Sequence, residues 1–166
     1  AKRAPATGRV KHRGAVVQQV GEARVTVDGR VTGAVVAGFL VRLGGAAADG
    51  EAHARLRAAK IARLRVFTDK EDKMNLSLLD VGGGALVVSQ FTLYADTARG
   101  NRPSFIQAAP PEQANALYEL FCRELAAQGV AVEKGVFGAH MDVRPHNDGP
   151  VTILLDTAAW HVSGGA

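Results

Sequence analysis

The chain has 166 residues, of which 47% are hydrophobic and 22% are charged. This composition is typical of a single globular domain and excludes a disordered chain. The net charge of +4 permits a phosphate-bearing partner without requiring one. No apolar run approaches the roughly 18 residues of a membrane-spanning helix. A lone cysteine, Cys122, cannot form an internal disulfide, and the basic N-terminus lacks an apolar signal core, so we expect a cytoplasmic protein.

The first part of the chain is rich in β-branched residues that alternate with polar ones. The pattern predicts strands at 15–20, 23–27, 30–36 and 38–43. Asp28-Gly29 separates the second run from the third, and this dipeptide is a strong hairpin signal because both turn residues need positive φ. We therefore expect these four strands to form an antiparallel meander.

Two segments have the spacing of amphipathic helices. Glu51 to Leu64 is the first, with an expected buried stripe at Ala52, Leu56, Ala59 and Lys60. The second begins at Pro110-Pro111-Glu112, where proline and an acidic residue suit a first turn, and ends before Gly129. Cys122 lies within this helix, and we interpret it as a packing residue in preference to a nucleophile.

Further strands are expected at 65–67, 85–90, 130–137, 141–144 and 151–155, whereas 68–80 and 96–104 are interpreted as polar loops. Asn147-Asp148-Gly149-Pro150 is a dense turn signature. The predicted fold class is α+β: a single domain of mostly antiparallel strands with two main helices.

The stretch Val87 to Thr97 delivers small polar side chains at the end of an apolar run. Strand residues alternate between faces, so we expect Ser89, Phe91 and Leu93 to point one way and Gln90, Thr92 and Tyr94 to point the other. Such polar groups are either satisfied core groups or the floor of a site. A nucleophile at Ser89 or Thr92 stays open, although Ser89 lacks a Gly-x-Ser-x-Gly elbow.

The histidines have no metal-ligand spacing, and neither a Walker A motif nor a dinucleotide glycine pattern is present. We therefore expect neither a metal ion nor a cofactor.

Two motifs together resemble a known family. Ser89-Gln90-Phe91-Thr92-Leu93 and Asn147-Asp148-Gly149-Pro150-Val151-Thr152 are similar to the signature motifs of D-aminoacyl-tRNA deacylase. The likeness extends in register over 15–18, 25–29, 73–77, 102–105 and 135–139. It defines an expected domain at 13–157, with a flexible basic tail at 1–12 and a C-terminal tail at 158–166.

The resemblance implies a homodimer with a partly closed, barrel-like sheet and active sites at the subunit interface. The implied reaction is hydrolysis of the ester joining a D-amino acid to the 3′ adenosine of tRNA, with glycyl-tRNA as a further substrate. A cis Gly149-Pro150 would enter the partner's pocket and exclude L side chains with its main chain. Ser89, Gln90, Phe91 and Thr92 would form the catalytic stretch, with the ribose 2′-hydroxyl in place of a protein base.

Phe137 and Met141 match family positions that line the adenosine pocket, and Arg99 and Arg102 are candidates for phosphate contact. Two departures from the family stand out. Gln19 replaces a usual arginine that is expected to support the Gly-Pro element. Arg144-Pro145-His146 replaces a more apolar approach to Asn147, and His146 is a minor alternative as a base.

Two competing functions are left open. A nucleic-acid-binding module without turnover is suggested by the basic tail and the arginine loop. A small-molecule esterase would use Ser89 or Thr92 as its nucleophile.

Overall fold

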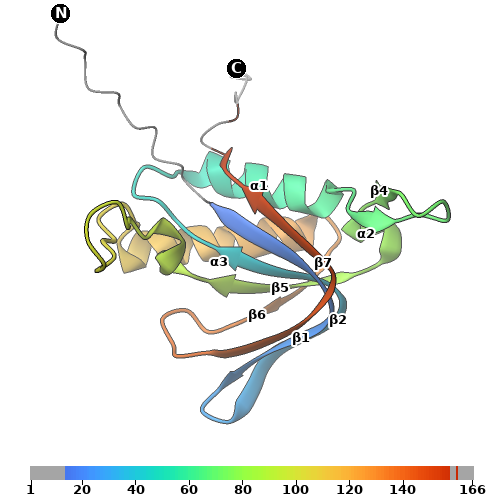
Figure 1. The fold of residues 1–166 in the computed structure, drawn as a ribbon, viewed down its shortest axis with the longest axis horizontal. Helices are drawn as coiled ribbons and strands as arrows, with labels where there is room; N and C mark the ends of the chain where they lie inside the picture. The colour runs from blue at the N-terminus through green and yellow to red at the C-terminus, as the bar shows by residue number, and fades with distance from the viewer. Residues whose placement is uncertain (1–13, 158–159, 161–166) are drawn as a thin grey trace, which may run out of the picture.

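A computed structural model describes residues 14–157 and 160 of the chain. It contains a five-stranded sheet with the strand order β6-β5-β2-β1-β7, and two long helices cover one face of this sheet (Figure 1). The elements are β1 (Ala15–Val27), β2 (Arg30–Leu43), α1 (Glu51–Arg63), β3 (Phe67–Thr68), β4 (Met74–Leu76), α2 (Leu78–Val81), β5 (Gly84–Ser89), the 3-10 turn η1 (Phe91–Tyr94), α3 (Pro111–Ala127), β6 (Ala131–Lys134) and β7 (Asp142–Leu155). None of the described helices is long and apolar enough to cross a membrane.

The predicted N-terminal meander is instead one long hairpin. Strands β1 and β2 pair antiparallel along their whole length, and Asp28 and Gly29 form the turn with φ of 48° and 77°. The expected breaks near residues 21 and 37 are bends within continuous strands. At the second bend Gly38 has φ +154°, and a Cβ there would collide with the Gly84 carbonyl of the neighbouring strand. The bend therefore requires glycine.

The sheet is mixed: antiparallel pairing predominates, as expected, but two of its strand pairs are parallel, which the sequence did not predict. Strands β1–β2 and β1–β7 pair antiparallel, whereas β2–β5 and β5–β6 pair parallel. The two long helices lie in the connections between the parallel strands, which cannot be joined by short turns. Residues Ala85 to Val88 of β5 are all buried. A strand covered on both faces reads as a continuous apolar run, which is typical of parallel strands, but the run does not show which strands lie beside it.

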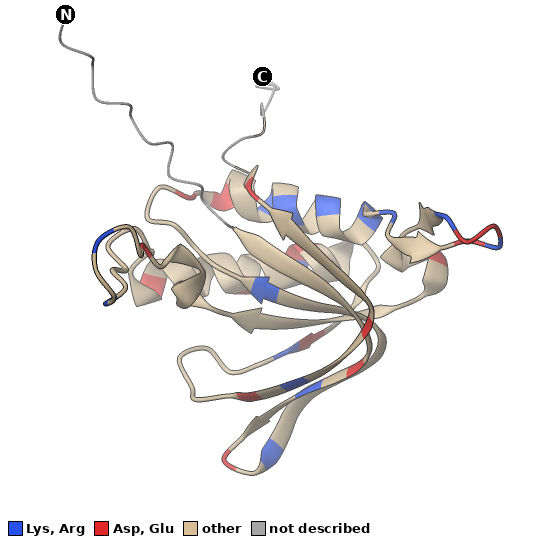
Figure 2. Ribbon diagram, viewed as in Figure 1, with Lys and Arg blue, Asp and Glu red and all other residues tan. Residues whose placement is uncertain are grey.

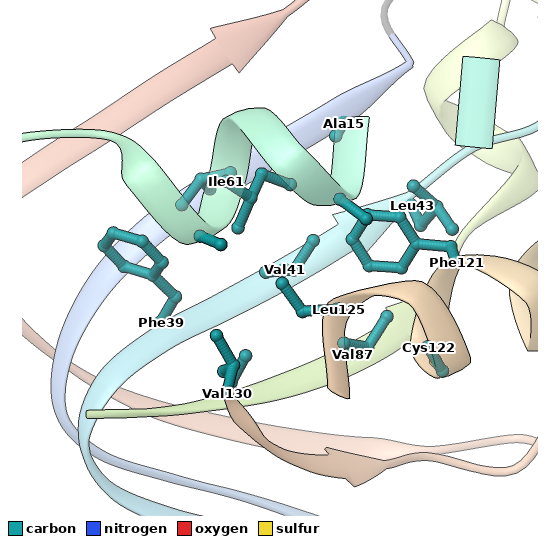
Figure 3. Close-up of a cluster of buried hydrophobic side chains, with 14 of the residues drawn as sticks. Ala15, Phe39, Val41, Leu43, Ile61, Val87, Phe121, Cys122, Leu125 and Val130 are labelled. Carbon is teal, nitrogen blue, oxygen red and sulfur yellow. The ribbon is translucent and has the colours of Figure 1, made fainter. Parts of the chain in front are cut away.

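The main core lies between the sheet and the two long helices (Figure 3). Phe39 and Phe121 fill it from opposite sides, and neither has any exposed surface. A second cluster lies on the other face of the sheet, where β1 and β2 curve over β5; its members include Val25, Leu40 and Leu86. The sheet is thus strongly curved, with β6 and β7 at its two edges. Closure into a barrel stays a prediction.

The helix at Glu51–Arg63 was correctly expected, but its buried stripe was not. The buried residues are Ala54, Arg57, Ala58, Ile61 and Ala62. The expected stripe of Ala52, Leu56, Ala59 and Lys60 did not include Arg57. The structure buries this side chain to 4% exposure, where its Nη2 lies 3.0 Å from the carboxylate of Asp49, itself only 7% exposed. Asp49 also accepts a hydrogen bond from the N–H of Ala46, so the ion pair braces the loop after β2.

The predicted loop 68–80 contains further structure. It holds the short strand β4 and the short helix α2, so the described chain has three α-helices and not only the two long ones. Ser77 and Asp80 form a reciprocal capping box at the start of α2, a motif that satisfies two backbone donors. The resulting hydrogen bonds to Ser77 lower the pKa of the Asp80 carboxyl.

The predicted tails, 1–12 and 158–166, lie outside the described residues except for Trp160. The Lys60 ammonium nitrogen lies 5.2 Å from the Trp160 ring centre. His53 Nδ1 is 3.1 Å from the Thr157 hydroxyl. Thr157 and Trp160 therefore both contact α1.

The Asp49–Arg57 pair provides a test of the core. Asp49→Ala should lower the free energy of unfolding by about 3–5 kcal/mol, because it leaves the Arg57 guanidinium buried without a counter-charge. Denaturant unfolding monitored by circular dichroism measures the change. The double substitution Asp49→Ala with Arg57→Leu should recover much of the loss, since both charges are then absent. Glu71→Ala, which removes half of an exposed ion pair with Lys73, is the control and should have little effect. An unchanged midpoint in Asp49→Ala would contradict the buried pair.

Candidate active site

A cleft of about 590 Å³ opens at the end of β5, where the sequence predicted the site. Three segments far apart in the chain form its walls: the turn after β5, the segment leading into α3, and the loop between β6 and β7. The lining residues are Gly45, Ser89, Gln90, Phe91, Thr92, Phe105, Ala108, Ala109, Pro110, Pro111, Ala114, Phe137, Gly138, Ala139 and Met141. The cleft therefore unites the predicted catalytic stretch with both predicted adenosine-pocket residues.

Strand β5 ends at Ser89, so the expected alternation of side chains through Tyr94 is wrong. Ser89 is the last residue of β5 in register with β2, opposite Leu43. The N–H of Gln90 then donates to the Leu43 carbonyl at 2.8 Å, and η1 begins immediately afterwards. The change from strand to turn places Phe91 and Thr92 together at the cleft instead of on opposite faces.

One carbonyl on β5 anchors the loop between β6 and β7. The Val87 carbonyl accepts hydrogen bonds from the Tyr118 hydroxyl at 2.9 Å and from the Gly135 N–H at 3.0 Å. The Phe137 ring lies 6.2 Å from the Tyr118 ring, in a tilted arrangement. Burial raises the pKa of Tyr118, so its hydroxyl stays protonated and acts as a donor. The hydrogen bonds to the Val87 carbonyl and the ring contact with Tyr118 together set the position of Phe137 at the cleft.

The segment leading into α3 forms the opposite wall of the cleft. It is bonded to the loop after β2, which the Asp49–Arg57 ion pair braces. Ala46 forms a β-bridge with Ala108, and the Ala109 N–H donates to the Gly45 carbonyl at 2.8 Å. At the cleft the Phe91 and Phe105 rings pack edge to face, with their ring centres 5.1 Å apart. The Asp49–Arg57 pair therefore supports the wall without lining the cleft.

None of the described residues that line the cleft carries a charge. His146 lies in a separate groove with Glu22 and Arg24, so it is not in position to act as a base in the cleft of its own chain. The polar side chains present are Ser89, Gln90 and Thr92, and Gln90 Nε2 lies 3.1 Å from the Thr92 hydroxyl. These neutral groups can position a substrate and donate hydrogen bonds.

Gly149 and Pro150 lie within β7, so the predicted turn at 147–150 is wrong, while the cis peptide bond between them is confirmed. Both residues are exposed and neither lines the cleft of their own chain. Gln18 pairs with Thr152 and Val20 with Asn147, so the single residue between them on β1, Gln19, faces the four residues 148–151.

Arg99 and Arg102 are exposed on the loop 96–104, which projects beyond η1 (Figure 2). Backbone hydrogen bonds between Asp96 and Ser104, at 2.8 and 2.9 Å, close the loop at its base. Neither arginine lines the cleft. The loop joins two of the cleft walls.

Sequence reasoning missed several residues at or behind the cleft. Gly45, Ala108, Ala109 and Ala114 are small and carry no chemical signal, and Pro110 and Pro111 were interpreted only as the start of a helix. Phe105 and the pair Gly138-Ala139 fell within the family likeness, but no role was assigned to them. Arg42 stands in an apolar strand, and an arginine in such a run is the one signal that could have been followed.

Comparison with known proteins decides the family. A sequence profile described as D-Tyr-tRNA(Tyr) deacylase matches residues 16–156. The chain belongs to the D-Tyr-tRNA(Tyr) deacylase family. A D-aminoacyl-tRNA deacylase of Roseiflexus castenholzii is 62% identical over 146 residues, 88% of this chain and 93% of the relative. One of Anaeromyxobacter dehalogenans is 60% identical over 143 residues, covering 86% and 96%. These deacylases confirm the expectation of an ester hydrolase.

Two solved structures share the deacylase fold. The protein titled c-Myc DNA Unwinding Element Binding Protein is 41% identical, with a TM-score of 0.79 over 85% of this chain and 96% of that one. A structure titled as a probable eukaryotic D-amino acid tRNA deacylase has a TM-score of 0.74 over 86% and 97%, at 19% identity. The second likeness concerns the fold alone.

The packing role predicted for Cys122 can be tested with iodoacetamide. The side chain is only 5% exposed, and burial raises the pKa of its thiol to about 12. At pH 8 about one thiol in ten thousand is then ionised. We expect no alkylation of the native deacylase over hours and complete alkylation in guanidinium, measured by mass spectrometry. Rapid alkylation of the native protein with loss of activity would restore the nucleophile interpretation.

Proposed function

We propose that this protein hydrolyses the ester bond of D-aminoacyl-tRNA in the cleft at the end of β5, and that Gly149-Pro150 of a second copy completes the site. The proposal rests on the observation that the two motifs of the family lie apart from each other within one chain. The uncharged cleft contains Ser89 to Thr92, whereas the exposed Gly149-Pro150 lies on the same chain outside it. Family membership supports the same reading.

The ester is already activated, so the reaction needs positioning, a water molecule and stabilisation of the developing oxyanion. Backbone N–H groups in the turn after β5 are suited to that stabilisation. The Gln90 N–H is already bonded to the Leu43 carbonyl. Leu93 donates back to the Gln90 carbonyl. The N–H groups of Phe91 and Thr92, which lie between them at the cleft, are therefore the donors that we assign to the oxyanion.

Proton removal from the attacking water needs a base, and the side chains that line the cleft supply none. We assign this role to the 2′-hydroxyl of the terminal ribose, which is adjacent to the ester in the substrate itself. The protein then contributes geometry and hydrogen-bond donors, and Thr92 lines the site without acting as a nucleophile.

Chirality is selected by exclusion. Main-chain atoms of Gly149 and Pro150 from the partner would occupy the space that an L side chain needs, while a D side chain points away from them. Gly149 has φ +125°, a conformation that suits glycine. Such a wall rejects one enantiomer without binding the side chain of the other, so many D-amino acids are accepted. Glycine has no side chain to exclude, and glycyl-tRNA is therefore also a substrate.

The remaining predicted contacts concern the tRNA. Phe137 and Met141 line the cleft and offer an aromatic face and an adaptable thioether to the terminal adenine. Arg99 and Arg102, on the exposed loop, are assigned to backbone phosphates. A homodimer acting on tRNA belongs in the compartment of translation, the cytoplasm.

The activity is tested with purified protein and two substrates, D-tyrosyl-tRNA and L-tyrosyl-tRNA. We expect release of D-tyrosine with at least a hundredfold preference over L-tyrosine, because about 3 kcal/mol of steric exclusion corresponds to such a ratio. Release is measured with radiolabelled amino acid. Spontaneous hydrolysis without protein is the control. Cleavage of neither substrate, or of both at equal rates, would contradict the proposal.

The shared site is tested by co-expressing two inactive variants with different affinity tags. Thr92→Trp fills the exposed cleft position, and Gly149→Val places a side chain where its first carbon would lie 2.9 Å from Val151. A dimer containing one of each has one intact site, so a random mixture should recover about a quarter of the wild-type activity. Each homodimer alone is the control. No recovery in the purified heterodimer would show that each chain builds its own site.

A further inference from the structure

Arg42 stands behind the cleft, in the middle of the sheet. It lies on β2, where it pairs with Val16 of β1 and Val88 of β5. Its side chain is half-buried, and burial lowers its pKa from the ordinary arginine value. An arginine nevertheless stays charged at neutral pH, because its ordinary pKa exceeds 12. Arg42 does not line the cleft, so any effect on the reaction passes through another residue.

The contacts of Arg42 are to neutral amides. Its Nη1 donates to Gln90 Oε1 at 3.2 Å, and its Nε donates to Gln18 Oε1 at 3.4 Å. Among the described residues no carboxylate lies within ion-pair distance of it. A half-buried positive charge without a counter-charge costs free energy of desolvation. The guanidinium instead makes charge-assisted hydrogen bonds, which are stronger than those between neutral groups.

The guanidinium decides which way the Gln90 amide points. Arginine has five donors and no acceptor, so only the oxygen of the amide can face it. The amide nitrogen must then face away, and it lies 3.1 Å from the Thr92 hydroxyl oxygen. The reverse orientation would place two donors against each other at Arg42. Chemistry alone therefore makes Gln90 the donor and Thr92 the acceptor in this pair.

This polarity determines what Thr92 offers to the cleft. Its oxygen accepts from Gln90, so its own hydrogen is free to donate elsewhere. A hydroxyl held in this way is a directed donor and a poor nucleophile, because no base accepts its proton.

We propose that Arg42 is a positioning residue: by orienting the Gln90 amide, it makes the Thr92 hydroxyl a hydrogen-bond donor to an oxygen of the bound aminoacyl ester. The inference rests on the proposed function for the identity of the substrate. The orientation of the amide does not depend on that function, because it follows from the contacts of Arg42 within one chain.

A double-mutant cycle tests the coupling. Arg42→Leu and Thr92→Val should each lower kcat/KM for D-tyrosyl-tRNA about tenfold, the value of one lost hydrogen bond. The double variant should lose little more than either single variant, because both act on the same donor. Arg42→Lys, which also presents only donors, should restore activity to within about threefold of wild type. Multiplied losses of about a hundredfold in the double variant would overturn the proposal.

The substitution Gln90→Glu tests whether Arg42 orients the Gln90 amide or only supports the structure of the sheet. A carboxylate keeps the contact with Arg42 but has no donor, so the Thr92 hydroxyl must turn and donate to it. We expect this variant to have an unchanged or raised thermal midpoint and at least a tenfold lower kcat, with a smaller change in KM. If Gln90→Glu kept full activity, Arg42 would serve only to support the sheet.

A nuclear magnetic resonance experiment on the free protein is independent of turnover. The Gln90 side-chain amide protons should show a nuclear Overhauser effect to the Thr92 methyl group, and this effect should weaken in Arg42→Leu but persist in Arg42→Lys. Its absence in the wild type would overturn the assigned orientation. If the wild type gave this signal but cleaved no D-aminoacyl-tRNA, the orientation would stand and the proposed function would fail.

Discussion

The parallel register between β5 and β2 is the constraint on which the site depends. Ser89 is the last residue of β5 in that register, and the Gln90 N–H closes the ladder on the Leu43 carbonyl. Because β5 is buried on both faces, a shift of one residue would move every apolar side chain to the wrong layer. The core therefore holds the strand end, and with it the turn Phe91–Tyr94, at one position.

Segments distant in the sequence reach the cleft through a few buried polar contacts. The Val87 carbonyl, which accepts from Tyr118 and Gly135, fixes the loop that carries Phe137. The Asp49–Arg57 pair braces the loop that bonds to the wall before α3. A buried ion pair is costly to desolvate, and its value lies in geometry more than in net stability. Such contacts allow an uncharged cleft to have a defined shape.

An uncharged cleft limits the chemistry that the protein can perform. The described side chains that line it include no charged acid or base, so orientation and hydrogen-bond donation are the contributions that we propose for the chain. Arg42 contributes from outside the cleft. Gln90 lies between Arg42 and Thr92, and the guanidinium orients the Gln90 amide so that the amide nitrogen donates to the Thr92 hydroxyl. This arrangement gives a polar site without a fixed charge that would bind the wrong groups.

The sequence by itself determined what local physics controls. The hairpin at Asp28-Gly29, the helix opened by Pro110-Pro111 and the apolar strand predicted at 85–90 follow from turn chemistry, helix capping and hydrophobic patterning, and two matching motifs indicated the family. Only the tertiary structure decided that β5 lies between β2 and β6 and parallel to both, because the apolar run of β5 does not record which strands pair with it. It also decided that Arg57 is buried, that residues 147–150 continue a strand, and that Arg42 lies behind Gln90. Each of these depends on a partner that arrives from elsewhere in the chain, and no local pattern records that partner.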